Sequence, residues 1–233
     1  MLLDYDGTLV PIAPTPDLAQ PDAELIALLG LLSAREGTWV HLVSGRPATV
    51  LDDWFGDLPL ALWAEHGAYR RLSRESEWQA TLPVRTEWMA DVLPTLDQIT
   101  RETPGSFIEQ KRASIAWHYR GADPELGPNQ AHDLRVRLRQ AVRTHSLEVL
   151  EGRRVIEIRM AGVSKAAVAR HVVDGAGDLP AILAIGDDWT DEDLFNALPE
   201  SSVTIAVGRR TSSADYQLPD DGAVRGLLER ILR

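Results

Sequence analysis

Short apolar runs that end in a polar turn recur along the chain, and we interpret each as a buried strand of a parallel sheet. They lie at residues 2–3, 38–43, 181–185 and 202–207. Between the first two runs, residues 22–35 place apolar side chains three and four positions apart, which predicts a helix connecting neighbouring parallel strands. The outer parts of the chain therefore predict an α/β core with a Rossmann-like parallel sheet.

The middle of the chain has a different pattern of apolar and polar positions. In order, it predicts a hairpin, a helix, a strand pair, a second helix and a second strand pair, at residues 67–81, 87–101, 106–120, 130–144 and 147–160. Such a group inside an alternating β/α pattern predicts a smaller α+β domain inserted into the parallel sheet. We place the insertion at residues 82–158, which leaves 1–81 and 159–233 to the core.

Composition and charge narrow the class of protein. With 233 residues, 44% hydrophobic and 25% charged, the chain has room for a core and an inserted domain and has the composition of ordinary globular proteins. A formal net charge of −11 disfavours nucleic acid, because a phosphate backbone is bound by clustered basic residues. No apolar run approaches the roughly 18 residues of a membrane-spanning helix, and no signal peptide is recognised. We expect a cytoplasmic monomer without membrane partners, and the short run before Asp4 leaves a truncated or misassigned start open.

Three turns that follow or precede predicted elements carry candidate chemistry. Asp4 and Asp6 follow the first strand, so both fall at the carboxyl edge of the sheet, where open α/β folds bind ligands; a polar turn is the alternative. Ser44 closes the second strand before a helix and could hold phosphate, or only cap that helix. Lys165 starts a helix at 165–173, where a cation is unfavourable without a nearby anion; a solvated surface lysine is the alternative.

The segment that follows the predicted strand at residues 181–185 is the most acidic of the candidate segments. Thr190 and Asp193 are spaced like a capping box, which leaves Asp187, Asp188 and Asp191 facing the same edge as Asp4. Unit charges about 4 Å apart repel by roughly 4 kcal/mol at an effective dielectric of about 20, so such a cluster needs a cation. Oxygen ligands without cysteine favour Mg²⁺ over zinc.

Together these four segments resemble the signature motifs of the haloacid dehalogenase superfamily of phosphotransferases. The resemblance implies that Asp4 is the nucleophile, that Asp6 is the general acid and base, and that Ser44 and Lys165 hold the phosphoryl group. It also implies a Mg²⁺ site formed by Asp4, Asp6 (through its backbone carbonyl) and Asp187, with Asp188 close behind and Asp191 orienting Lys165. Gly45 and Arg46, next to Ser44, are candidate substrate contacts.

The inserted segment narrows the resemblance further. The runs Glu109-Gln110-Lys111, His118-Tyr119-Arg120 and Val155 to Arg159, with Glu65-His66-Gly67 before them, are similar to the trehalose-6-phosphate phosphatase family. Side chains that donate and accept hydrogen bonds suit sugar hydroxyls. The candidate sugar contacts are Glu109, Lys111, Arg120, Glu157 and His66; a solvated strand face is the alternative for each.

The resemblance implies a function and leaves two alternatives. The leading hypothesis is Mg²⁺-dependent hydrolysis of trehalose 6-phosphate to trehalose and phosphate, through an aspartyl-phosphate on Asp4, in trehalose biosynthesis. A phosphatase for another small sugar phosphate, such as sucrose 6-phosphate or mannosylglycerate phosphate, is the first alternative. A non-catalytic sugar-phosphate sensor is the second.

Overall fold

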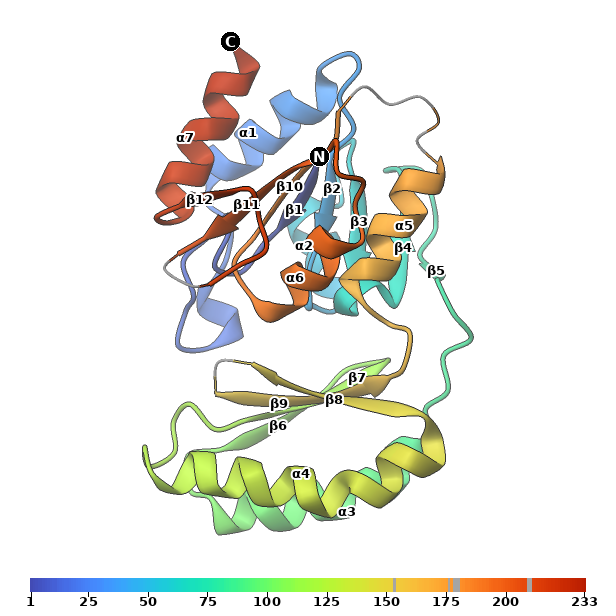
Figure 1. The fold of residues 1–233 in the computed structure, drawn as a ribbon, viewed down its shortest axis with the longest axis vertical. Coiled ribbons are helices and arrows are strands. Elements are labelled where there is room, and N and C mark those ends of the chain that lie inside the picture. Colours follow the sequence, from blue (N-terminus) through green and yellow to red (C-terminus); the bar gives the residue numbers. More distant parts are fainter. Residues whose placement is uncertain (153, 176, 178–180, 209–210) are drawn as a thin grey trace. The chain divides into compact units, whose positions relative to one another are not determined.

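The computed structural model describes residues 1–152, 154–175, 177, 181–208 and 211–233 (Figure 1). These residues form two compact units, one of Met1–Thr81 with Ser164–Arg233 and the other of Leu82–Val163. The second unit ends five residues after the expected position 158, because its last strand runs to Met160 and is followed by a turn. No helix among the described residues is both long and apolar enough to cross a membrane.

The first unit is built on an eight-stranded sheet. Its strand order is β12-β11-β10-β1-β2-β3-β4-β5, and the six strands from β12 to β3 pair in parallel. These six are β1 (Leu2–Asp4), β2 (His41–Val43), β3 (Ala61–Ala64), β10 (Leu183–Gly186), β11 (Val203–Val207) and β12 (Tyr216–Leu218). Two antiparallel strands, β4 (Tyr69–Arg71) and β5 (Gln79–Ala80), finish one edge. The predicted α/β class with a parallel-sheet core is confirmed.

Helices cover both faces of this sheet (Figure 1). On one face, α5 (Lys165–Gly175) and α6 (Trp189–Asn196) bury Val168 and Leu194 against Leu2, Val43 and Trp63 of the strands. On the other side, α1 (Ala23–Ala34) lies beside α7 (Asp221–Leu232). The unit also contains α2 (Ala48–Phe55) and two short 3₁₀ turns, η1 (Pro16–Leu18) and η2 (Glu65–Gly67).

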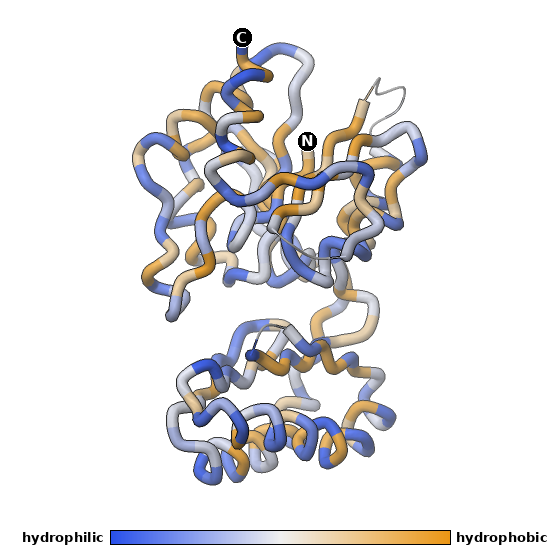
Figure 2. The backbone as a smooth tube through the Cα atoms, turned by 60° about the vertical axis from the view of Figure 1, so that its left-hand side comes forward, coloured by the Kyte–Doolittle hydropathy of each residue, from blue (hydrophilic) through white to orange (hydrophobic). Residues whose placement is uncertain are grey.

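The second unit is a four-stranded antiparallel sheet with two helices. The sheet order is β6-β7-β9-β8, made of β6 (Phe107–Gln110), β7 (Ser114–His118), β8 (Leu147–Gly152) and β9 (Val155–Met160). The helices are α3 (Trp88–Glu102) and α4 (Leu126–His145). Figure 2 shows hydrophobic and hydrophilic residues alternating along both helices, as expected when one helix face is buried. The prediction of an inserted unit with an α+β fold is confirmed.

Side-chain alternation divides the smaller sheet into an apolar and a polar face. Ile115, Trp117, Ile156 and Ile158 join one buried cluster with residues of α3 and α4. Since successive residues of a strand point to opposite faces, their neighbours lie on the other face. These neighbours are Ser114, Ala116, His118, Val155, Glu157 and Arg159.

Candidate active site

Asp4 is the last residue of β1, at the carboxyl edge of the sheet between β10 and β2. Its side chain is buried and both carboxylate oxygens are hydrogen-bonded. Oδ2 accepts from Thr8 Oγ1 at 3.0 Å, and Oδ1 accepts from Lys165 Nζ at 2.6 Å. The carboxylate is therefore fixed in one orientation.

Lys165 is the first residue of α5, and its side chain is only 2% exposed. The solvated-surface interpretation of this lysine is therefore wrong. The positive end of the helix dipole disfavours a cation here, but two carboxylates offset that cost. Besides the bond to Asp4, Nζ donates to Asp191 Oδ1 at 2.8 Å.

Asp191 and Asp188 form the capping box of α6. Asp191 Oδ2 accepts from the Asp188 backbone N–H at 3.0 Å, and Asp188 Oδ1 accepts from the Trp189 N–H at 2.6 Å. The predicted box of Thr190 and Asp193 is wrong, because the helix begins at Trp189, so Asp188 is its N-cap. Capping occupies the Asp188 carboxylate.

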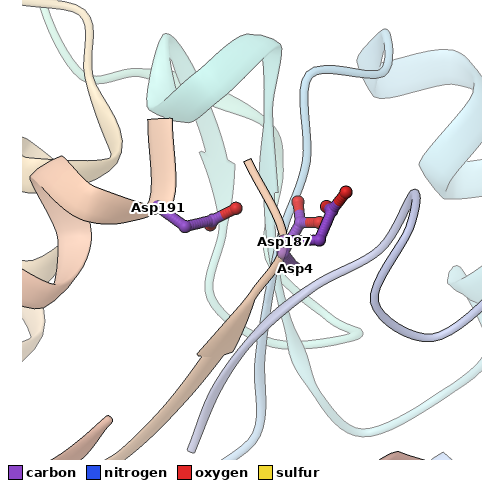
Figure 3. A group of neighbouring side chains, drawn as sticks. All are labelled: Asp4, Asp187 and Asp191. Atoms are coloured by element: carbon purple, nitrogen blue, oxygen red, sulfur yellow. The ribbon is translucent and has the colours of Figure 1, made fainter. Parts of the chain in front are cut away.

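A cluster of three carboxylates could hold a metal ion. Oxygens of Asp4, Asp187 and Asp191 all lie within 4.8 Å of one another, and Figure 3 shows the three side chains converging from β1, the end of β10 and α6. Oδ1 of Asp187 is buried and has no hydrogen-bond partner among the described residues. Gly7, at φ +85°, makes room for this group, since a Cβ there would lie 2.2 Å from Asp187 Oδ2.

The charges in this cluster perturb one another. Burial raises the pKa of Asp4 well above its ordinary value, with Asp191 and Asp187 adding to the effect and Lys165 opposing it. Burial, followed by repulsion from Asp191, raises the pKa of Asp187 to about 7. Burial would lower the pKa of Lys165, but Asp191 and Asp4 raise it above its usual range. Three carboxylates against one ammonium leave two negative charges, which suits a divalent cation.

The turn after β2 lies at the same edge of the sheet. Ser44 is buried, and its Oγ accepts from the Arg46 backbone N–H at 3.1 Å. The His66 ring lies against Gly45, where an added Cβ would come within 2.5 Å of Nε2. The Arg46 side chain pairs with Asp6, at 2.6 Å between Nη2 and Oδ1. The Asp6 side chain therefore pairs with Arg46, as that of Asp188 caps α6. Neither is one of the three carboxylates in the cluster of Asp4, Asp187 and Asp191.

Three of the candidate sugar contacts, Glu109, Lys111 and Glu157, belong to the polar face of the smaller sheet, whereas His66 lies in η2 of the first unit. Glu109 and Glu157 stand in one cross-strand row on either side of Ala116. Lys111 Nζ lies 3.4 Å from Glu157 Oε1. Arg120 is exposed and lies past the end of β7, outside this row.

The sequence prediction missed two hydrogen-bond partners of the Glu109 and Glu157 carboxylates. Ser114 Oγ donates to Glu157 Oε1 at 2.7 Å, and His118 Nε2 lies 2.8 Å from Glu109 Oε2. Alternation along β7 could have indicated them, because both belong to the face that carries Ala116.

Comparison with known proteins places the chain in a family. A family model described as trehalose-phosphatase matches residues 2–221. A bifunctional trehalose-6-phosphate synthase/phosphatase of Thermoproteus tenax is 38% identical over 231 residues, which cover 99% of this chain and 31% of that protein. The trehalose-6-phosphate phosphatase C-terminal domain of C. albicans has a TM-score of 0.92 and 31% identity, over 99% of this chain and 90% of that one.

A more distant similarity concerns the fold alone. A haloacid dehalogenase-like hydrolase from Bacteroides thetaiotaomicron has a TM-score of 0.67 at 16% identity, over 99% of this chain and 98% of that one. The chain spans 31%, 25% and 24% of the length of three curated relatives that it matches. Both resemblances drawn from the sequence, in fold and in family, are confirmed. The chain belongs to the trehalose-phosphatase family.

Proposed function

We propose that this chain hydrolyses trehalose 6-phosphate to trehalose and inorganic phosphate, a step of trehalose biosynthesis. One observation carries the proposal beyond family membership: the buried Asp4 carboxylate is held by Lys165 and lies within 4.8 Å of the Asp187 carboxylate, one oxygen of which has no partner in the described part of the chain. An oriented carboxylate next to a fixed ammonium and a candidate cation site is the arrangement that phosphoryl transfer to a side chain requires.

In the first half of the reaction, a carboxylate oxygen of Asp4 attacks the phosphorus atom. A bond forms between that oxygen and phosphorus, and the bond from phosphorus to the sugar oxygen breaks. The sugar oxygen takes a proton from Asp6 and leaves as a hydroxyl of trehalose. Lys165 and Ser44 hold the phosphoryl oxygens, and Asp191 keeps Lys165 in place through the 2.8 Å hydrogen bond.

In the second half, water attacks the phosphorus atom of the aspartyl-phosphate. Asp6 accepts the proton of that water, and the bond between phosphorus and the Asp4 oxygen breaks. Inorganic phosphate leaves with Asp4 again a carboxylate. Asp6 therefore acts as acid first and as base second, and it ends the cycle protonated as it began.

The acidic cluster fits a divalent cation, for which Mg²⁺ is our proposal. Asp4 and Asp187 would hold it, because Asp187 Oδ1 has no hydrogen-bond partner among the described residues and the carboxylates of the two residues lie within 4.8 Å of each other. When bound, Mg²⁺ reduces the repulsion between the attacking carboxylate and the phosphate dianion. The donor set contains only oxygens, which is the preference of this ion.

The second unit is proposed as the part that recognises the sugar. Glu109, Lys111 and Glu157 share one face of its sheet and can both donate and accept hydrogen bonds to glucose hydroxyls. His66 and Gly45, beside Ser44, are proposed contacts of the phosphate end. Arg120, exposed beyond β7, is the least supported of these contacts.

A panel of esters tests the proposal. Phosphate release is measured from trehalose 6-phosphate, sucrose 6-phosphate, mannosylglycerate phosphate and glucose 6-phosphate, with and without Mg²⁺. We expect the highest kcat/KM for trehalose 6-phosphate, and activity only with Mg²⁺. Preference for another ester would retain the mechanism and reject the substrate. Binding of trehalose 6-phosphate without phosphate release from any ester would indicate a sensor and contradict the proposal.

A further inference from the structure

Each nitrogen of the Arg46 guanidinium donates to a group of the chain itself. Its Nε donates to Asp6 Oδ2 at 2.8 Å and its Nη2 to Asp6 Oδ1 at 2.6 Å, which makes a bidentate pair. Its Nη1 donates to the Pro16 carbonyl oxygen at 3.0 Å. These bonds use three of the five N–H groups of the guanidinium, one on each nitrogen, and direct the fork at Asp6 and at the loop carbonyl.

Two aromatic rings fix the plane of this guanidinium. Its central carbon lies 4.6 Å from the ring centroid of Trp54 and 5.4 Å from that of Tyr5. Tyr5 is itself anchored, since its hydroxyl donates to the Ala19 carbonyl oxygen at 2.7 Å. Stacking on aromatic faces and a planar fork are properties that arginine has and lysine lacks.

Exposure differs between the two partners of the pair. The side chain of Arg46 is 9% exposed and that of Asp6 is 39% exposed. The carboxylate therefore remains accessible to a reactant while the arginine behind it does not.

We propose that Arg46 is a positioning residue, which orients the Asp6 carboxylate for proton transfer, and that it is not a substrate contact. This inference rests on the proposed function, because Asp6 transfers protons only if the chain is a phosphatase of this mechanism. It also revises the sequence prediction that placed Arg46 among the substrate contacts.

The test compares Arg46→Met with Arg46→Lys and with a matched control. Arg71→Met is that control, because Arg71 is also buried, pairs with an aspartate (Asp52), donates to the Gly56 carbonyl and stacks on Trp78, but belongs to β4. For each purified variant, kcat and KM are measured with trehalose 6-phosphate, and the burst of p-nitrophenolate is followed with p-nitrophenyl phosphate. Thermal unfolding of each variant reports its stability.

The proposal predicts a specific kinetic pattern. Arg46→Met lowers kcat for trehalose 6-phosphate about 10- to 100-fold with KM changed less than about threefold, since misorientation of a catalytic group costs rate more than binding. Arg46→Lys recovers little, because its point charge cannot reproduce the fork. The p-nitrophenolate burst persists while steady-state turnover falls, because this leaving group needs no proton but hydrolysis of the aspartyl-phosphate still needs Asp6. Adding Arg46→Met to Asp6→Asn lowers kcat no further.

Three results would overturn the inference. A rise in KM without loss of kcat would make Arg46 a substrate contact. Equal loss of burst and turnover, matching that of Arg71→Met at equal loss of stability, would make it merely structural. A wild-type protein that releases phosphate from neither ester would reject the proposed function, and this inference with it, whereas the other two results leave the proposed function intact.

Discussion

At the scale of single residues, the charge balance around Asp187 gives the site its dependence on pH. Its carboxylate is buried, one of its oxygens has no hydrogen-bond partner in the described part of the chain, and its pKa is raised to about 7. A carboxylic acid with a raised pKa stabilises the fold at low pH, and that contribution is lost as the pH rises through the raised value. Without metal, the charged form is therefore a cost above about pH 7.

This charge leads to a prediction about Mg²⁺ binding. Below about pH 7 a proton must leave Asp187 before the ion can bind, and Asp4, whose pKa burial also raises, must be ionised as well, so the apparent affinity for Mg²⁺ falls as the pH is lowered. The rise in melting temperature on adding Mg²⁺, measured on both sides of about pH 7, checks this. Asp187→Asn should abolish most of the rise at either pH. A rise that is equal at both pH values would contradict the account.

The sequence could predict which site residues lie close together only for residues at the ends of neighbouring strands. Asp4 ends β1 and Asp187 directly follows the neighbouring parallel strand β10, so their positions after the two apolar runs were enough to predict that both lie at one edge. The pairing of Asp6 with Arg46 could not be predicted in this way. It depends on how Tyr5 and Trp54 pack around the guanidinium, and no pattern of apolar and polar residues specifies such packing.

At the scale of elements, the start of α6 shows the limit of reading caps from sequence. Asp188 with Asp191 and Thr190 with Asp193 have the same spacing and similar chemistry, and the sequence does not say which pair precedes the first helical turn. The structure selects the first pair, which also directs Asp191 toward Lys165. The same residue, Asp191, therefore caps the helix and orients the Lys165 ammonium.

Paired alanine variants separate the two caps. Asp188→Ala should lower the free energy of unfolding by about 1 kcal/mol, because it removes the N-cap acceptor, whereas Thr190→Ala should change it by only a few tenths. Denaturant unfolding of both variants measures the difference. Equal losses, or a larger loss for Thr190→Ala, would contradict the assignment of the cap.

Strand prediction succeeded where side chains alternate or form buried runs, and failed at the sheet edge. The buried strands β1, β2, β10 and β11 lie within or beside the predicted apolar runs. The edge strand β12 was not predicted, because it has three residues, two of them exposed, and so carries no apolar pattern.

At the scale of the whole molecule, the chain combines a unit that is proposed to carry the phosphate chemistry with an inserted unit that is proposed to recognise the sugar. Each has its own buried core and its own sheet. The end of the insertion was predicted at residue 158 and lies at Val163, since apolar alternation does not mark where a strand gives way to a turn.

This division predicts that substrate preference and chemistry can be altered separately. Glu157→Gln keeps the size of the side chain but removes its charge next to Lys111 and Ser114. We expect kcat/KM for trehalose 6-phosphate to fall about 10- to 100-fold, as for loss of a hydrogen bond to a charged group. Activity toward p-nitrophenyl phosphate, which has no sugar, should be nearly unchanged. Equal losses with both esters would contradict a sugar-reading role.

The proposed mechanism depends on Asp4 as the nucleophile, and the variant Asp4→Asn tests this role. The amide has nearly the same shape as the carboxylate but no negative charge. Its oxygen can accept from Lys165, and its NH2 group can donate to the Thr8 hydroxyl oxygen. The decisive measurement is the initial rate of phosphate release from trehalose 6-phosphate with Mg²⁺. It is made on wild type and on this variant at a temperature below the melting temperature of both. If Asp4 is the nucleophile, the variant is folded and releases no phosphate above background. A folded variant with a rate near that of wild type would contradict it.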